Sequence, residues 1–401
     1  MGVDTEVTIV GGGPAGLATA IALGRRGVRV AILDQQSLPA DKVCGEGIMP
    51  PGLQFLEEVG ANSLISTADK FPFAGIHYLS RGGHSAQAEF EAGPGRGIRR
   101  IALSAALREV ATGMAGVTLH QGVRVTGVQR TEGQMNVHCA DRDPVSSRLV
   151  VGADGLRSRV RRWAGLERGP ARRQRFGVRQ HLRLAPWSRF VEVHSGPDLE
   201  AYVTPCGPDC VGVAILWEPR RCPWAMTGDG LFPSLLETIP ALHERLRGAE
   251  PASAPRSTGP FEQATSRRTT DGIALLGDAS GYLDPCTGEG LTLAFRQALA
   301  LEASVVPALE RHPSGVLGVR SLRGYERNWR KIMRPYFLST RAMLFCHRHP
   351  ALFERLIKFG AHRPDLLRHL FSFNMGTGPL LPSVGRAARW FLAPAPHAEN
   401  P

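Results

Sequence analysis

The chain has 401 residues, which exceeds one typical hydrophobic core and predicts at least two subdomains. Hydrophobic residues make up 43% and charged residues 21%, as in an ordinary globular protein, and no uncharged apolar run reaches the roughly 18 residues that a membrane-spanning helix needs. The formal net charge is +12, but no recognised nucleic-acid-binding fold or aromatic platform accompanies it, so we expect no nucleic-acid partner.

The N-terminus leads almost directly into a strand pattern. Asp4 and Glu6 stand where a targeting segment would carry basic residues before a long apolar region, so we expect no such segment. The seven cysteines form no CxxC pair and no zinc-ligand spacing, so we predict no metal site. Reduced thiols in the cytoplasm are the simplest interpretation.

Residues 5–34 predict a dinucleotide site. An apolar strand (Val7–Val10) runs into a glycine turn, an alanine-rich helix pattern, a second strand (Val28–Leu33) and Asp34. Glycines 11, 13 and 16 fill the G-x-G-x-x-G positions, which give a tight turn, backbone access for a pyrophosphate and close helix–strand packing. The helix N-terminus faces the phosphates, and the acid at the end of the second strand can accept hydrogen bonds from a ribose. This motif alone does not distinguish NAD from FAD.

The next loop, DKVCGEGIMP (41–50), places a cysteine directly before a Gly-Glu-Gly triplet. Either Cys44 carries redox or covalent chemistry, or the backbone must pass very close to another group. A dithiol role is disfavoured because no CxxC partner is nearby. We therefore predict that Cys44 lines a pocket, and that Gly45 and Gly47 allow close backbone passage while fixing the direction of Glu46.

Alternating strand patterns and two further turns follow along the chain. Residues 73–90 predict a hairpin with a Gly-Gly turn, and residues 174–217 contain several short strand patterns. In LVVGADGLRSRVR (149–161) and GIALLGDASGYLDPCTGEGL (272–291), an apolar run ends in a small turn that carries one aspartate, Asp154 and Asp278 respectively.

With these three motifs and the arginine of RRIALSAAL, the chain resembles the para-hydroxybenzoate hydroxylase-like FAD superfamily over about residues 5–310. That group includes group A flavin monooxygenases, geranylgeranyl reductases and flavin halogenases. The resemblance implies an α/β fold, in which a Rossmann-type FAD-binding domain is interleaved with an antiparallel β-sheet substrate domain and followed by a C-terminal helical segment. The implied boundaries are 1–70, 95–168 and 265–319 for the FAD-binding domain, 71–94 and 169–264 for the substrate domain, and 320–401 for the C-terminal region.

The resemblance also assigns roles around the cofactor. It places the glycine turn and the first turn of its helix at the pyrophosphate, Asp34 at the ribose and Asp278 at the ribityl chain. Asp154 and Gly155 form a "DG" motif implicated in both FAD and nicotinamide binding, and Arg100, with Arg99 as a competitor, flanks the flavin. The predicted FAD residues are Gly11, Gly13, Pro14, Ala15, Gly16, Asp34, Gln35, Arg100, Val125, Asp154, Gly155, Gly277, Asp278, Pro285, Gly288, Glu289, Gly290 and Leu291.

The loop DPCTGEG has a physical rationale at the flavin ring. Reduced flavin carries negative charge near N1 and C2=O, and a helix that begins near Leu291 aims unpaired N–H groups at that edge. Glycines 288 and 290 let the backbone approach without intruding side chains.

The resemblance favours one chemistry and leaves two alternatives. The first expectation is an NAD(P)H- and O2-dependent monooxygenase that hydroxylates an aromatic or polyketide-type molecule through a flavin C4a-hydroperoxide. The alternatives are a geranylgeranyl reductase-like enzyme that reduces isoprenoid double bonds, suggested by KVCGEG, and a flavin-fold binding protein without turnover. Halogenation is disfavoured because the WxWxIP motif is missing. NADPH is preferred over NADH only because the chain is rich in arginine.

A phenol is hydroxylated faster as its anion, so a base or a positive environment near the substrate would help. Histidines 77, 181 and 194 and Tyr202 are candidates on predicted strands, of which we name His181 and Tyr202. The candidate catalytic residues are Cys44, Glu46, His181 and Tyr202.

The C-terminal region is strongly basic. Residues 320–389 contain fourteen Lys and Arg against three acids, in patterns that predict amphipathic helices. The first interpretation is a solvated helical cap. The alternative is contact with an anionic membrane surface or an acyl-carrier partner.

Overall fold

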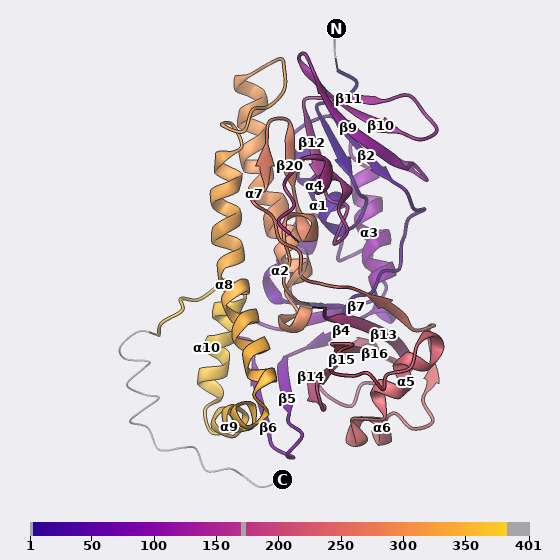
Figure 1. Cartoon of the computed structure of the whole chain (residues 1–401), viewed down its shortest axis with the longest axis vertical. Helices are drawn as coiled ribbons and strands as arrows, with labels where there is room; N and C mark the ends of the chain where they lie inside the picture. Colours follow the sequence, from indigo (N-terminus) through magenta and orange to yellow (C-terminus); the bar gives the residue numbers. More distant parts are fainter. Residues whose placement is uncertain (1–2, 170–173, 383–401) are drawn as a thin grey trace.

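The computed structural model describes residues 3–169 and 174–382 (Figure 1). In this view one half of the molecule holds a parallel sheet flanked by helices, and the other half holds a larger, mainly antiparallel sheet. The two halves are interleaved in the chain, which confirms the predicted fold class. The exact domain boundaries stay a prediction.

The parallel sheet has the order β19-β20-β12-β1-β2-β8, and only the β19–β20 pair is antiparallel. β1 and β2 are buried along their whole length, because helices cover one face of the sheet and a smaller sheet with α4 covers the other. The strand bounds are β1 Val7–Val10, β2 Val30–Asp34, β8 Val117–Gln121, β12 Leu149–Gly152, β19 Thr269–Thr270 and β20 Ile273–Leu275.

Three helices pack around this sheet: α1 (Pro14–Gly24), α3 (Arg100–Thr112) and α7 (Gly290–Arg311). α1 begins so close to β1 that a Cβ on Gly16 would lie 1.9 Å from the carbonyl oxygen of Gly11. Only glycine permits this approach. A small antiparallel sheet and short helix α4 complete this half: β9 Val125–Thr131, β10 Gln134–Cys139, β11 Val145–Ser147 and α4 Arg159–Trp163.

The larger sheet has eight strands in the order β17-β13-β16-β15-β14-β5-β6, with β18 also pairing with β13. The predicted hairpin within 73–90 is present as β5 and β6, and β5 joins β14 in parallel, which brings segments more than 100 residues apart into one sheet. The bounds are β5 Gly75–Leu79, β6 Ser85–Glu89, β13 Phe176–Arg183, β14 Phe190–Ser195, β15 Leu199–Gly207, β16 Cys210–Trp217, β17 Glu250–Pro251 and β18 Arg256–Thr258.

Short elements join the halves and cover the larger sheet. A three-stranded sheet, β3-β7-β4, carries the loop after Asp34 to the large sheet, and β15 packs against β4 and β7. The remaining elements before the C-terminal region are β3 Gly47–Ile48, β4 Lys70–Phe73, β7 Gly95–Ile98, α2 Pro50–Glu58, α5 Leu231–Leu236, α6 Pro240–Arg245 and the 3-10 turns η1 Thr67–Asp69, η2 Gly228–Gly230, η3 Gly277–Ser280 and η4 Pro285–Thr287.

The basic C-terminal region is helical, as predicted. It consists of α8 (Arg323–Arg348), α9 (Pro350–Ala361) and α10 (Pro364–Asn374), and α9 and α10 pack against β6. Arg386 and Arg389, counted in its charge, lie outside the described residues. None of the described helices is both long and apolar enough to cross a bilayer. Contact with a membrane surface stays a prediction.

Candidate functional site

The turn between β1 and α1 has the features that a bound pyrophosphate requires. Gly11 has φ +109°, and a Cβ there would lie 2.4 Å from the carbonyl oxygen of Ala153. Gly13 is the N-cap of α1, no side chain caps the helix, and a Cβ on this glycine would meet no atom within 4 Å. Open space beside the uncapped backbone N–H groups of Ala15 and Gly16, which follow Pro14 in the first turn, fits a diphosphate.

The acid at the end of β2 is held rigidly beside this turn. Asp34 is 5% exposed and accepts hydrogen bonds from the backbone N–H groups of Gly12 (2.5 Å) and Gln36 (2.7 Å). These bonds fix the carboxylate at the end of the strand, where the ribose is expected. Gln35 is exposed next to it, and Val125 lies buried at the start of β9.

Arg100 and Asp278 lie close enough to influence each other's charge within the expected cofactor site. Arg100 is 6% exposed at the first position of α3, and its buried Nη1 has no hydrogen-bond partner among the described residues. Burial raises the pKa of Asp278 to about 6, although Arg100 and Lys42 oppose the shift. A buried guanidinium nitrogen without a partner, beside a carboxylate, fits polar groups of a ligand such as the ribityl chain and flavin edge. Arg99 instead approaches Cys210, so the geometry favours Arg100 over its neighbour.

The "DG" aspartate has a local structural task. The carboxylate of Asp154 accepts hydrogen bonds from the hydroxyl of Ser158 (2.5 Å) and the N–H groups of Arg159 (2.7 Å) and Val160 (3.1 Å). Asp154 therefore caps the start of α4, and Gly155 takes φ +78° in the turn between them. Contact of these two residues with a cofactor stays a prediction.

The loop before α7 agrees with the sequence expectation in its geometry. η4 begins at Pro285, Gly288 has φ +70°, and α7 starts at Gly290 without a side-chain cap, one residue before the predicted Leu291. Glu289 is 2% exposed, and burial raises its pKa to about 8. Its carboxyl group lies 3.3 Å from the amide of Asn374 on α10. The loop therefore contains a carboxyl group that is protonated at neutral pH.

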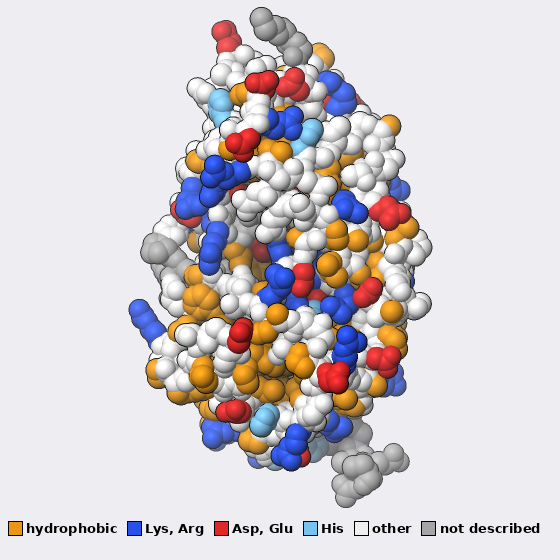
Figure 2. Space-filling model, turned by 90° about the vertical axis from the view of Figure 1, so that its right-hand side faces the viewer, with side chains coloured by type: hydrophobic (Ala, Val, Ile, Leu, Met, Phe, Trp, Pro, Cys, Tyr) orange, Lys and Arg blue, Asp and Glu red, His pale blue; other side chains and the backbone are white. Residues whose placement is uncertain are grey.

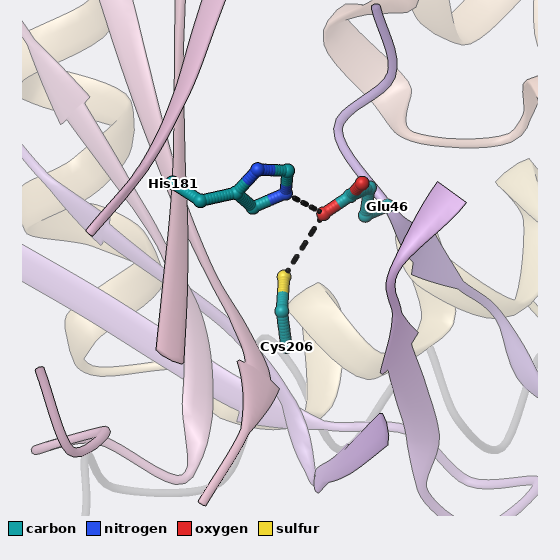
Figure 3. Close-up of side chains that lie close together, drawn as sticks. All are labelled: Glu46, His181 and Cys206. Carbon is teal, nitrogen blue, oxygen red and sulfur yellow. Dashed lines mark hydrogen bonds and ion pairs between the residues drawn. The ribbon is translucent and has the colours of Figure 1, made fainter. Parts of the chain in front are cut away.

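Glu46 is the centre of a buried cluster between the two halves (Figure 3). It is one of two described non-glycine residues with positive φ, at +61°, and its side chain is directed toward the large sheet. One oxygen accepts a hydrogen bond from the backbone N–H of Arg100 (2.8 Å). The other lies 2.6 Å from Nε2 of His181 and 3.3 Å from the thiol of Cys206. The glutamate thus joins the loop, the start of α3 and strands β13 and β15.

Arg179 fixes the protonation pattern of this cluster. Its Nη1 lies 2.6 Å from Nδ1 of His181, and since a guanidinium can only donate, Nδ1 accepts and Nε2 donates its proton to Glu46. Burial alone would raise the pKa of Glu46, but the hydrogen bond from His181 and the charge of Arg179 hold it below its usual value. Asp41 in turn pairs with Arg179 at 2.6 Å.

Glu46, His181 and Cys206 also offer three metal-ligating atoms within 4.8 Å of one another, a grouping sought among the described residues only. The donor set alone suits zinc. However, Nδ1 of His181 and one oxygen of Glu46 are already bonded to an arginine and to a backbone N–H, and burial raises the pKa of the Cys206 thiol well above its usual value. A guanidinium bonded to the histidine, together with a protonated thiol, disfavours a metal ion, so these contacts support a hydrogen-bonded cluster.

A second buried cluster surrounds Tyr202. Its hydroxyl donates to Glu200 (2.5 Å) and lies 3.1 Å from the carbonyl oxygen of Cys286, next to the expected flavin loop. Arg175 bridges Glu200 and Asp284, and His347 of α8 lies 3.0 Å from Glu200. Burial opposes ionisation of Glu200, but His347 and Arg175 lower its pKa strongly.

The Tyr202 cluster changes one expectation and adds residues that the sequence did not indicate. Burial raises the pKa of Tyr202 well above its usual value, so its phenol stays protonated and serves as a donor, not as the base suggested by sequence. Arg175, Glu200 and His347 were missed because they come from distant parts of the sequence: directly before β13, on β15 and on α8. Of the other two histidines, His194 pairs with Glu192, and His77 lies beside Phe190.

An apolar wall lies beside the same loop. A Cβ on Gly288 would come within 2.9 Å of the Met49 methyl group, and Met49 belongs to a buried cluster that joins the two halves to α10. The cluster consists of Met49, Phe73, Ala88, Phe90, Val191, Phe371 and Met375. In the view of Figure 2, hydrophobic side chains also gather on the lower half of the surface, and Lys and Arg are frequent near the middle.

Comparison with known proteins agrees with this geometry. Residues 4–317 match the family model described as "FAD binding domain". The chain is 28% identical over 325 residues to the ubiquinone hydroxylase UbiL of Rhodospirillum rubrum, which covers 76% of this chain and 72% of that one. It is 28% identical over 314 residues to the menaquinone reductase of Mycobacterium tuberculosis, covering 73% and 74%.

The fold also has solved counterparts. A flavoprotein/dehydrogenase from Cytophaga hutchinsonii superposes with a TM-score of 0.80 at 19% identity, over 92% of each chain. The family match spans most of the chain and includes the glycine turn, Arg100, Asp154 and Asp278. The chain therefore belongs to the FAD binding domain family and is an FAD-dependent oxidoreductase of the para-hydroxybenzoate hydroxylase-like superfamily.

Proposed function

We propose that this enzyme is a monooxygenase that uses NAD(P)H and O2 to hydroxylate an aromatic, quinone-like or polyketide-type small molecule. The observation that carries the proposal is the apolar wall around Met49 beside Gly288, at the loop where the flavin ring is expected. Such a wall suits a flat, poorly hydrated ring, and a hydroxylase of a quinone is among the relatives.

Bound FAD supplies the redox chemistry and the activation of oxygen, and the chain's own residues prepare the site. The Met49 cluster excludes water from the substrate ring. The hydroxyl of Tyr202 and the carbonyl of Cys286 form a polar edge beside this wall. Together, the wall and this edge form an apolar pocket with one polar rim, which orients a ring that carries an oxygen substituent.

In this proposal Glu46 is a positioning residue. It is 2% exposed and both of its oxygens are bonded within the protein, so it has no free acceptor for a substrate proton. Its bonds instead hold the loop 44–47 against α3 and the sheet. A Cβ on Gly45 would meet no atom within 4 Å, so the loop borders open space where the flavin or the substrate is expected.

A reductase of isoprenoid double bonds is the second candidate. Its supporting observations are the KVCGEG loop and the similarity to a menaquinone reductase. A flavin-fold protein without turnover is not proposed further, because the chain belongs to a family of FAD-dependent oxidoreductases.

Turnover under air and under anaerobic conditions separates the two candidates. The FAD-loaded enzyme is incubated with NADPH or NADH and a panel of phenols, quinones and prenyl compounds, and product masses are measured. A hydroxylase gives substrate-stimulated oxidation of the reductant and a product heavier by one oxygen atom only under air. An unchanged product mass under air contradicts the proposal, and a product that gains two hydrogens without oxygen establishes the reductase.

A further inference from the structure

A hollow of about 360 Å³ lies between the end of α7 and the start of α8. Four arginines line it: Arg311 is the last residue of α7, Arg320 lies in the connection, and Arg323 and Arg327 lie on the first turns of α8. Arg323 and Arg327 are four residues apart and therefore lie on the same side of α8, and Arg320 precedes the helix on the same hollow. Ser321 completes the polar lining.

None of these four arginines is neutralised by an ion pair with another described residue. Arg311 donates from Nε only to the backbone carbonyl of Pro307, at 2.9 Å. The acids of the same helices are engaged elsewhere, since Glu302 pairs with Arg26 and Glu326 with Arg268 and Arg330. Glu310 is not part of the lining. Four exposed cations therefore surround one hollow without a counter-charge from the part of the chain that the structure describes.

The start of α8 adds backbone donors to this hollow. No side chain caps the helix, and the N–H of Gly324 bonds to no described residue. A Cβ at Gly324 would lie 2.9 Å from the hydroxyl oxygen of Ser304, so glycine lets α8 begin tightly against α7. The uncapped N–H groups and the positive end of the helix dipole then favour an anion among the arginines.

We propose that this hollow binds a phosphoryl group, either of a soluble phosphate compound or of a phospholipid headgroup. Arginine presents paired N–H donors that match phosphate oxygens, and an anion removes the mutual repulsion of the four side chains. The hollow is distinct from the cofactor site, because the 22 residues of α7 separate Arg311 by about 33 Å from the loop expected at the flavin. The proposal is independent of the reaction that the enzyme catalyses.

Calorimetric titration of the FAD-loaded protein with inorganic pyrophosphate, at constant ionic strength, tests the site. The test variant is Arg320→Gln/Arg323→Gln. The matched control is Arg355→Gln/Lys358→Gln, which removes the same charge from exposed positions on α9. We expect saturable binding that weakens at least tenfold in the test variant and less than twofold in the control. FAD absorbance and the melting temperature check that both variants are folded, and Arg327→Gln provides a milder test variant.

Vesicles identify the source of the phosphoryl group. Sedimentation with vesicles of phosphatidylcholine containing phosphatidic acid, lost in the test variant and kept in the control, identifies a lipid headgroup. Binding of pyrophosphate without binding of vesicles identifies a soluble phosphate. Equal losses of binding in the test and control variants would overturn the proposal, because a diffuse positive field does not distinguish the two pairs of charges. The absence of saturable binding to either probe would overturn it as well.

Discussion

Two Gly-Glu-Gly triplets carry buried glutamates in opposite states. Glu46 and Glu289 are each 2% exposed and each lies on a loop expected near the flavin. The pKa of Glu46 is below its usual value because His181 and Arg179 compensate its burial, whereas burial raises the pKa of Glu289 to about 8 with only Arg296 and Thr292 opposing it. The shared triplet therefore sets where the backbone passes, and the residues that other elements place around each glutamate set the charge of its carboxyl group.

The largest expected effect comes from substituting Glu46→Gln. The carboxylate now accepts hydrogen bonds from the backbone N–H of Arg100 and from Nε2–H of His181. The glutamine NH2 group would face one of these two donors and could not accept its hydrogen bond. Removing one partner of a buried charged contact typically costs about 3–5 kcal/mol, so we expect the free energy of unfolding at pH 7 to fall by that amount. Denaturant unfolding of the FAD-loaded protein measures this change.

Glu289→Gln is the matched control for that measurement. A protonated carboxyl group and an amide can both donate one hydrogen bond, so this substitution should change the free energy of unfolding at pH 6 by less than about 1 kcal/mol. Similar losses for both variants would contradict the assignment of opposite charges.

The second prediction concerns pH. Folded Glu289 keeps its proton up to about pH 8, while the unfolded chain loses it near 4.5, so between these values unfolding releases a proton. The free energy of unfolding should then fall as the pH rises, by about 1.4 kcal/mol per unit and up to about 5 kcal/mol in total, and level off above pH 8. The contribution of Glu46 has the opposite sign, since it is present above the usual glutamate pKa and lost as the pH falls through the lowered value.

Unfolding curves of the wild type and of Glu289→Gln between pH 5 and pH 9 isolate this contribution. The wild type should lose more stability than the variant as the pH rises to 8, and the two should run parallel above it. Parallel curves over the whole range would show that Glu289 is ionised in the folded protein.

Tyr202→Phe gives a third, smaller effect. It removes the hydroxyl that donates to Glu200 but leaves the contacts of that carboxylate with Arg175 and His347. A hydrogen bond to a charged group contributes about 1.5–3 kcal/mol, so we expect a loss near the lower end of that range. If Tyr202 also orients the substrate, kcat/KM should fall while FAD content is unchanged. A variant with wild-type stability and kinetics would remove Tyr202 from the site.

Much of the cofactor-binding region was predictable because it depends on local patterns. A strand, a glycine turn, a helix and an acid occur within 30 residues, and the structure has them as β1, α1, β2 and Asp34. The glycines of the two triplets were also informative, because close passage of a backbone excludes side chains. The interleaving of two sheets followed from alternating strand patterns between apolar parallel ones.

The partners of the buried carboxylates could not be found in the same way. His181 meets Glu46 across 135 residues, and His347 reaches Glu200 from α8. The sequence named His181 and Glu46 as separate candidates but did not indicate that they pair, and it did not indicate His347. Each pairing depends on how β13 and α8 pack against other elements. Ionisation depends on such packing, so the charge of Glu46 and that of Glu289 were beyond the reach of sequence patterns.

Cys44→Ser should have the smallest effect, and it separates the loop's packing from its chemistry. The Cys44 sulfur accepts a hydrogen bond from the N–H of Glu46 at 3.3 Å, and a serine oxygen can accept the same bond. Burial raises the pKa of the thiol, so it is protonated and a poor nucleophile at neutral pH. We therefore expect a loss of less than about 1 kcal/mol in stability, retained FAD and less than a tenfold change in kcat. Abolished turnover with FAD still bound would instead assign chemistry to Cys44, and the Glu46 contacts would then serve to hold a reacting sulfur in place.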